Sequence, residues 1–117
     1  MTSKLFDSAI ETPGGYRDVR PSDLHAVPGS VRIVDVREPA EFTGELGHLP
    51  RAELVPLSTL PVQAARWARE QEILVVCRSG GRSSKGAQQL RQLGFARVMN
   101  LAGGMMAYAG SGLPVER

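Results

Sequence analysis

The sequence predicts an α/β fold in which a central, mostly parallel sheet of five strands is flanked by helices on both faces. Three apolar runs have the length of buried strands, and segments with helical features lie between them. The runs are apolar enough to be covered on both faces of a sheet. Strands that alternate with helices are typical of an α/β sandwich of three layers, with the sheet in the middle.

Five segments have the composition of β-strands. The strongest are the runs "RIVDV", "EILVVC" and "RVMNL", and the shorter candidates are "YRDV" and "AELV". The eight prolines and thirteen glycines are scattered between the periodic segments, which indicates short elements joined by turns. The expected strands cover residues 16–19, 32–36, 52–55, 72–77 and 97–101.

Four further segments have helical features. Pro39 and Pro61 suit the first turn of a helix, and Gly94 suits a C-terminal cap. Apolar residues recur on one stripe in the third and fourth of these segments. The expected helices lie within residues 22–27, 39–42, 60–70 and 82–95.

The length of the chain bounds its organisation. A chain of 117 residues can form one hydrophobic core and is too short for two ordinary ones. No repeat, low-complexity tract or linker divides it. We therefore expect one domain over residues 15–117, preceded by a loosely ordered N-terminal extension at residues 1–14.

Composition excludes several classes of function. A formal net charge of +2 is too small to indicate a nucleic-acid or membrane partner. The single cysteine forms no internal disulfide, and His25 and His48 do not have metal-ligand spacing. No signal peptide or membrane span is evident, so the sequence predicts a soluble, cytoplasmic protein without a metal or cofactor.

The only cysteine lies where an expected strand gives way to a loop of small and cationic residues, in "VVCRSGGRSSKG". Ligands of parallel sheets bind beyond the carboxyl ends of the strands. The helix that follows the loop offers unpaired N–H groups and a positive dipole end, and glycines let the backbone curl around the sulfur. The sequence therefore predicts a reactive thiolate on Cys77, surrounded by Arg78, Ser79, Gly80, Gly81 and Arg82.

The loop suits an anionic substrate. Arg78 and Arg82 provide cations for bidentate hydrogen bonds, and N–H donors stabilise a thiolate. Sulfane sulfur on an anion such as thiosulfate, or an oxyanion such as phosphate or arsenate, fits this description. Cys77 and Arg82 are spaced as C-x4-R, whereas cysteine phosphatases have a C-x5-R loop that admits a phosphoryl group. The shorter loop favours one sulfur atom.

Three separated signatures resemble the rhodanese family of sulfurtransferases, from about Gly15 to the end of the chain. "IVDVREPAEFTGELGHLPRA" is similar to the first family signature, and "VVCRSGGRS" to the catalytic loop. "VMNLAGGMMAYAGSGLPV" resembles the closing signature. The resemblance implies a rhodanese-like three-layer sandwich and a sulfurtransferase activity.

The resemblance also implies the roles of the loop residues. Cys77 would take sulfane sulfur as a persulfide, and the amides of residues 78–82 would bind its outer sulfur. Arg78 is also arginine in relatives that use thiosulfate, whereas Ser79 and Gly80 are similar to the loop of relatives that use mercaptopyruvate. The expected donor is a small anion, with thiosulfate favoured. The expected acceptor is cyanide, a thiol, thioredoxin or another protein.

Two other functions stay open at this point. One is a sulfur-carrier or sensor module, in which the persulfide forms on Cys77 but is delivered to a partner or read as a signal. The other, less favoured, is a cysteine phosphatase or arsenate reductase; the reductase generally needs a second, resolving cysteine, which this chain lacks.

Residues outside the loop have structural interpretations. For Asp35, an ion pair with Arg37 or a loop hydrogen bond is favoured over a catalytic role. His48 is interpreted as a turn or core histidine with satisfied hydrogen bonds. The chain departs from the family pattern at Arg51, where glycine is usual, and at Tyr108, where tryptophan is usual. If its ring lines the mouth of the pocket, Tyr108 would alter acceptor preference.

Overall fold

A computed structural model describes all of residues 1–117 and has a six-stranded sheet in the order β1-β2-β6-β5-β3-β4. The strands are β1 (Ile10–Glu11), β2 (Arg17–Val19), β3 (Arg32–Asp35), β4 (Glu53–Leu54), β5 (Ile73–Val76) and β6 (Val98–Leu101). All neighbouring strands are parallel except β1, which pairs antiparallel with β2. The mostly parallel α/β sheet is thus confirmed, with β1 as a strand that the sequence did not indicate.

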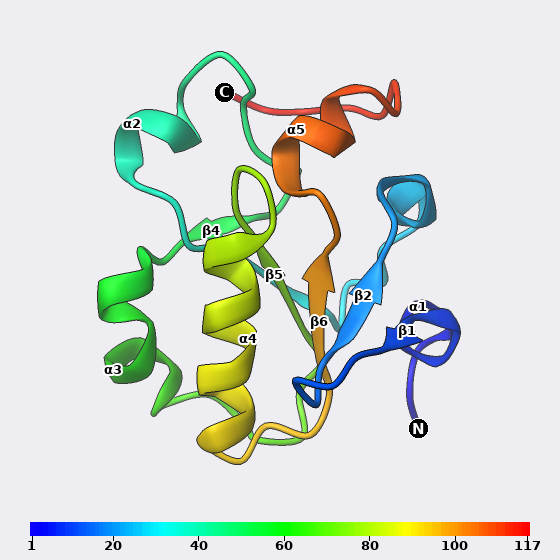
Figure 1. The fold of residues 1–117 in the computed structure, drawn as a ribbon, viewed down its shortest axis with the longest axis vertical. Helices are drawn as coiled ribbons and strands as arrows, with labels where there is room; N and C mark the ends of the chain where they lie inside the picture. The colour runs from blue at the N-terminus through cyan, green and yellow to red at the C-terminus, as the bar shows by residue number, and fades with distance from the viewer.

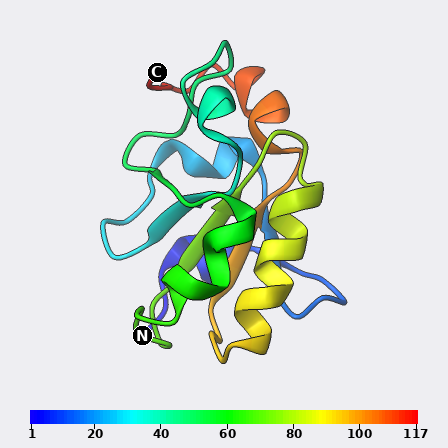
Figure 2. The same cartoon turned by 90° about the vertical axis from the view of Figure 1, so that its left-hand side faces the viewer.

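Helices cover both faces of the sheet, as the sequence predicts. They are α1 (Lys4–Ser8), α2 (Pro39–Phe42), α3 (Leu60–Ala64), α4 (Gly81–Gln92) and α5 (Gly104–Ala109), with 3-10 turns η1 (Pro21–His25) and η2 (Leu57–Thr59). Figure 1 shows α3 and α4 on one side of the sheet and α1 and η1 on the other. Figure 2 shows α3 and α4 from the front, packed across the strands.

The core consists of two apolar clusters separated by the sheet. Successive residues of β5 alternate between them: Leu74 and Val76 belong to the cluster under α1 and α5, whereas Ile73 and Val75 belong to the one under α3 and α4. This alternation is the period-2 geometry of a strand. Every residue of β5 is buried, which explains why its sequence is uniformly apolar.

The N-terminal residues, where the sequence predicts a loosely ordered extension at residues 1–14, include helix α1 and strand β1. Leu5 and Phe6 of α1 are buried in the core. Ser3 caps the helix by accepting a hydrogen bond from the N–H of Phe6, and its own N–H donates to the Glu72 carboxylate at 2.7 Å. Two apolar side chains and one capping residue therefore attach this segment to the face of the sheet that α1 and α5 cover.

The third helix is shorter than expected. α3 ends at Ala64, whereas the expected helix lies within residues 60–70. The Arg69 guanidinium donates to the carbonyls of Ala64, Trp67 and Leu93 at 3.3, 2.6 and 2.9 Å. The bonds to Ala64 and Trp67 satisfy carbonyls that a longer helix would have paired, and the bond to Leu93 reaches the end of α4. No helix in the structure combines the length and hydropathy that a membrane crossing requires.

Candidate functional site

Cys77 immediately follows β5, at the end of the sheet toward which β2 and β6 point in Figure 1. Its side chain is buried, with 1% of its surface exposed. The loop then reaches Gly80, which has a φ of +105° and is the N-cap of α4. This left-handed conformation favours glycine, and it turns the chain so that the start of α4 faces the sulfur.

The sulfur of Cys77 accepts hydrogen bonds from both the loop and the helix. The N–H of Gly80 donates to Sγ at 3.0 Å, and the Ser83 hydroxyl lies 3.3 Å from it. Burial raises the pKa of the Cys77 thiol, but the Ser83 hydroxyl and the N–H groups of Ser83, Gly80 and Ser79 lower it by more, so the net pKa lies below its ordinary value. The arrangement thus stabilises a thiolate in a buried position.

Helix α5 binds the backbone of the loop through hydrogen bonds. The N–H of Met105 donates to the Cys77 carbonyl at 2.8 Å, and the N–H of Met106 to the Arg78 carbonyl at 2.9 Å. Gly104 has a φ of +61°, and a Cβ there would lie 2.5 Å from the Arg78 carbonyl oxygen. Only glycine allows α5 to approach so closely.

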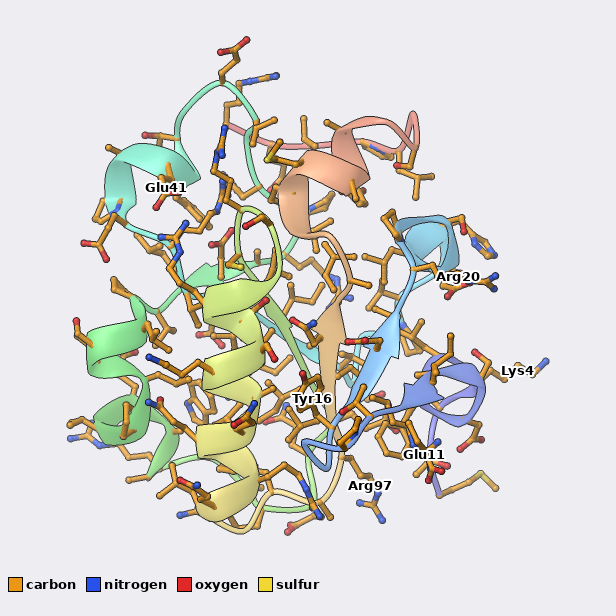
Figure 3. All side chains as sticks on the ribbon, viewed as in Figure 1. Lys4, Glu11, Tyr16, Arg20, Glu41 and Arg97 are labelled. Atoms are coloured by element: carbon orange, nitrogen blue, oxygen red, sulfur yellow. The ribbon has the colours of Figure 1, made fainter.

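Arg82 forms an ion pair with Glu41 of α2. Its guanidinium donates to both carboxylate oxygens of Glu41 at 2.7 and 2.8 Å. The Arg82 hydrogen bond is the main cause that lowers the pKa of Glu41 from 4.5 to about 2. Figure 3 labels Glu41 on α2, at the end of the sheet where α4 begins. In this structure Arg82 therefore anchors α2 to α4.

Arg78 is the exposed cation of the loop. It lines a cavity of about 230 Å³ that opens beside α2, together with Arg37, Ala40, Glu41, Gly44, Glu45 and Leu46. No ion pair holds the Arg78 side chain, in contrast to that of Arg82. Arg78 is thus free to receive an anion at this end of the sheet.

Asp35 and Arg37 form the predicted ion pair at the end of β3. Arg37 donates from Nε and Nη2 to the Asp35 carboxylate at 2.9 and 2.8 Å, and both side chains are almost fully buried. Arg37 Nη2 also donates to the Gly47 carbonyl at 2.7 Å. The pair joins β3 to the segment that follows α2.

His48 has the satisfied environment expected for a turn histidine. Its Nδ1 lies 2.7 Å from the Phe42 carbonyl, and its ring stacks on the Phe42 ring with centroids 3.7 Å apart. His48 is 9% exposed. It secures the chain after α2.

The two departures from the family pattern have different outcomes. Arg51 adopts a φ of +67°, so the turn keeps the left-handed conformation with a non-glycine residue. Tyr108 is buried, and its hydroxyl donates to the Pro114 carbonyl at 2.7 Å. Its ring lines a separate, mostly apolar cavity with Leu113 and Pro114 rather than the cavity beside Arg78, so the suggested effect on acceptor preference has no support.

Two polar residues that connect to the sulfur through hydrogen bonds were not among the candidates from the sequence. Ser83 is fully buried and contacts Cys77, and Asn100 of β6 accepts a hydrogen bond from the Ser83 hydroxyl at 2.5 Å. Ser83 directly follows Arg82 on the first turn of α4, a position from which a side chain can reach the loop. The sequence offers only a weak indication of Asn100, which is the one amide residue in an otherwise apolar strand.

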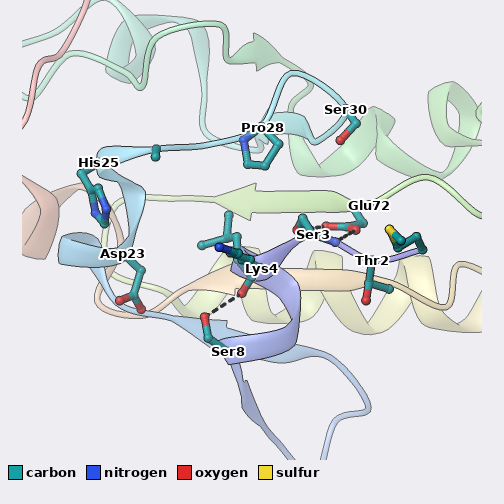
Figure 4. Close-up of a pocket in the computed structure, with 12 residues that line it drawn as sticks. Thr2, Ser3, Lys4, Ser8, Asp23, His25, Pro28, Ser30 and Glu72 are labelled. Atoms are coloured by element: carbon teal, nitrogen blue, oxygen red, sulfur yellow. Dashed lines mark hydrogen bonds between the residues drawn. The ribbon is translucent and has the colours of Figure 1, made fainter.

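The largest cavity lies away from the cysteine. It has a volume of about 590 Å³ and lies beside α1, where Figure 4 shows Ser3, Lys4, Asp23, His25 and Glu72 around it. The Glu72 carboxylate is already bound by Ser3. No group of His, Cys, Asp and Glu side chains in the structure is arranged to hold a metal ion.

Comparisons with known proteins agree on one family. The model of the rhodanese-like domain matches residues 18–111. A protein named sulfurtransferase from Allochromatium vinosum is 38% identical over 85 residues, 73% of this chain and 78% of that protein. Thiosulfate sulfurtransferase 16 of Arabidopsis thaliana chloroplasts is 34% identical over 97 residues, 73% of this chain and 79% of that protein. The crystal structure of a rhodanese-related protein from Thermoplasma volcanium has a TM-score of 0.75 at 28% identity, covering 85% of this chain and 96% of that one.

Proposed function

Because the chain belongs to the rhodanese-like domain family, we propose that it is an enzyme that transfers sulfane sulfur through a persulfide on Cys77. One observation carries the proposal. The Cys77 sulfur is buried yet accepts hydrogen bonds from the Gly80 N–H and the Ser83 hydroxyl, and the net effect lowers its pKa. A structural cysteine has no need of such donors, whereas a nucleophile does.

The proposed donor is thiosulfate. The Cys77 thiolate attacks the outer sulfur of thiosulfate, a new S–S bond forms, and the old S–S bond breaks with its electron pair leaving on sulfite. The outer sulfur of the persulfide then carries the negative charge, which the N–H groups of residues 78–82 stabilise. Arg78, exposed and without an ion-pair partner, attracts the dianion, and one relative is named for thiosulfate.

The second half of the reaction regenerates the thiolate. A nucleophilic acceptor such as cyanide or a thiol attacks the outer sulfur, and the electron pair of the persulfide bond returns to the Cys77 sulfur. No other group needs to be oxidised or reduced. A protein thiol such as that of thioredoxin is the expected acceptor in the cell, and a chain with one free cysteine suits the reducing cytoplasm.

Intact-mass measurement tests this function. Protein incubated with excess thiosulfate and then freed of donor should carry one extra sulfur atom, cyanide should remove it, and Cys77→Ser should never acquire it. Para-nitrophenyl phosphate should stay unhydrolysed in parallel. Phosphate release that depends on Cys77, without a sulfur adduct, would overturn the proposal.

The same protein distinguishes an enzyme from a carrier. Repeated turnover of thiosulfate with cyanide supports the enzyme. Stoichiometric loading followed by slow release would instead support the sulfur-carrier module.

A further inference from the structure

A chain of hydrogen bonds links the sulfur to the Asp18 carboxylate on the same face of the sheet. The Ser83 hydroxyl lies 3.3 Å from Cys77 Sγ and 2.5 Å from Asn100 Oδ1. Asn100 Nδ2 donates to Asp18 Oδ1 at 3.0 Å. Asp18 of β2 and Asn100 of β6 are direct partners in the sheet, so the register itself places them together. The chain thus passes through α4, β6 and β2.

The chemistry of these groups fixes the direction of each bond. A carboxylate only accepts hydrogen bonds, so Asp18 holds the NH₂ group of Asn100 and turns its amide oxygen toward Ser83. The hydroxyl of Ser83 has one proton, and Cys77 Sγ, Asn100 Oδ1 and the Gly80 carbonyl all lie within reach of it. Sulfur and amide oxygen therefore compete for that proton, at a site where Ser83 is fully buried and Asn100 is 5% exposed.

We propose that Asn100, oriented by Asp18, is a positioning residue for the Ser83 hydroxyl. While Cys77 carries the second sulfur, the hydroxyl donates its hydrogen bond to Asn100; when the Cys77 thiolate is free, the hydroxyl donates to the thiolate instead. In the structure the Ser83 hydroxyl lies nearer to Asn100 Oδ1, at 2.5 Å, than to Sγ, at 3.3 Å. When the free enzyme is ionised, the negative charge makes Sγ the stronger acceptor and draws the hydroxyl toward sulfur. In the persulfide the charge lies on the outer sulfur, and Sγ becomes a neutral, weak acceptor. The hydroxyl then donates to Asn100 without leaving a buried group unpaired.

This proposal rests on the proposed sulfur transfer but has a consequence that is measurable without any donor. An acceptor that competes for the Ser83 proton weakens the bond to the thiolate. Removing the Asn100 oxygen should therefore make the thiol more acidic, whereas removing the Ser83 hydroxyl should make it less acidic. A merely structural Asn100 predicts the opposite sign, because a loosened loop would lose donors to the sulfur.

The surrounding charges stay the same in the variants at Ser83 and Asn100. They are Arg78 and Arg82 of the loop, Glu41 of α2, the Asp35–Arg37 pair after β3, Lys85 of α4 and Asp18 of β2. Helix α5 contributes no charged side chain. Changes in the pH profile of these variants therefore report the hydrogen bonds of Ser83.

The experiment measures the pH midpoint of alkylation of Cys77 by iodoacetamide in the absence of a sulfur donor. Asn100→Leu should move the midpoint to lower pH. Ser83→Ala should move it to higher pH, so that below the midpoint Ser83→Ala is alkylated about threefold or more slowly than the parent protein. Ser84→Ala is the matched control, because the Ser84 hydroxyl bonds to Tyr16 rather than to sulfur, and its midpoint should not change.

A double-mutant cycle identifies the route of the effect. In the Ser83→Ala background, Asn100→Leu should produce no further shift, since Asn100 acts only through the hydroxyl. Asp18→Asn frees the Asn100 amide to turn its NH₂ group toward Ser83 and also removes one negative charge. It should therefore lower the midpoint more in the parent protein than in the Ser83→Ala background, where only the charge effect remains. It also reports on the proposal if Asn100→Leu does not fold.

Two results would overturn the inference. One is a midpoint in Asn100→Leu that rises toward that of Ser83→Ala. The other is an Asn100→Leu shift that persists in full in the Ser83→Ala background. If sulfur loads on the protein, a second readout follows: sulfite should reverse loading of Asn100→Leu more readily than loading of the parent, by about threefold or more in the equilibrium constant. Failure of loading alone would contradict the proposed function and leave the alkylation result standing.

Discussion

Replacing Glu41 by Gln should change the stability of the fold and the affinity for an anionic donor in opposite directions. The substitution keeps the shape of the side chain but removes the charge that binds Arg82. Its hydrogen bonds of 2.7 and 2.8 Å to the guanidinium are the main reason that the pKa of Glu41 falls from 4.5 to about 2. If fully retained, such a change would stabilise the fold by about 3 kcal/mol at neutral pH.

Solvent reduces this magnitude. The Glu41 and Arg82 side chains are 29% and 38% exposed, and pairs with that exposure contribute about 1 kcal/mol. The carboxyl has a lower pKa in the folded protein than in the unfolded chain, so its contribution is complete above pH 4.5 and is lost as the pH falls toward about 2. Glu41→Gln should therefore lower the free energy of unfolding by about 1 kcal/mol at pH 7 and by much less near pH 3.

The same substitution should improve donor binding. Arg82, once released, becomes available to thiosulfate, so KM should fall by about threefold or more. Urea unfolding at several pH values and steady-state kinetics measure the two effects. Glu45→Gln is the matched control, because Glu45 lines the same cavity without an ion-pair partner. A stability difference that does not depend on pH, together with an unchanged or higher KM, would refute this account of the pair.

Three further substitutions test the supports of the site. Gly104→Ala should slow alkylation of the thiol and destabilise the fold by about 1 to 3 kcal/mol, because a Cβ would lie 2.5 Å from the Arg78 carbonyl at a φ of +61°; Gly110→Ala, whose nearest such contact is 3.5 Å, should have little effect in either assay. Asp35→Asn leaves the buried charge of Arg37 without its partner and should lower the free energy of unfolding in urea by about 3 kcal/mol or more. Arg78→Ala should reduce kcat/KM for thiosulfate by about tenfold or more while the urea midpoint is unchanged, and an unaltered kcat/KM would remove this residue from donor binding.

Local sequence signals predicted the parts of the structure that local forces determine. The apolar run that ends at Cys77 and the glycines that follow it indicated a strand, a tight loop and a helix start, and β5, Gly80 and α4 have those positions. The ion pair of Asp35 and Arg37 was also predictable, since the two residues are only two positions apart on one strand end.

Partners that lie far apart in the chain were not predictable from one sequence. Glu41 and Arg82 are separated by 41 positions, and Asp18 and Asn100 by 82. Their contacts depend on strand order and register, which periodicity does not reveal. Ser83 was missed for a related reason, because a serine at a helix start is more often a simple cap than a donor to a neighbouring sulfur.

The attachment of α5 to the loop determines when, during synthesis of the chain, the loop around Cys77 can form. The N–H groups that bind the carbonyls of Cys77 and Arg78 belong to Met105 and Met106, which the ribosome adds after the cysteine. Asn100 is also added later. A nascent chain released before these residues should carry Cys77 as an ordinary thiol, because its loop lacks the later segments that shape it. Translation itself thus delays the appearance of the nucleophile until the sheet that encloses it is complete.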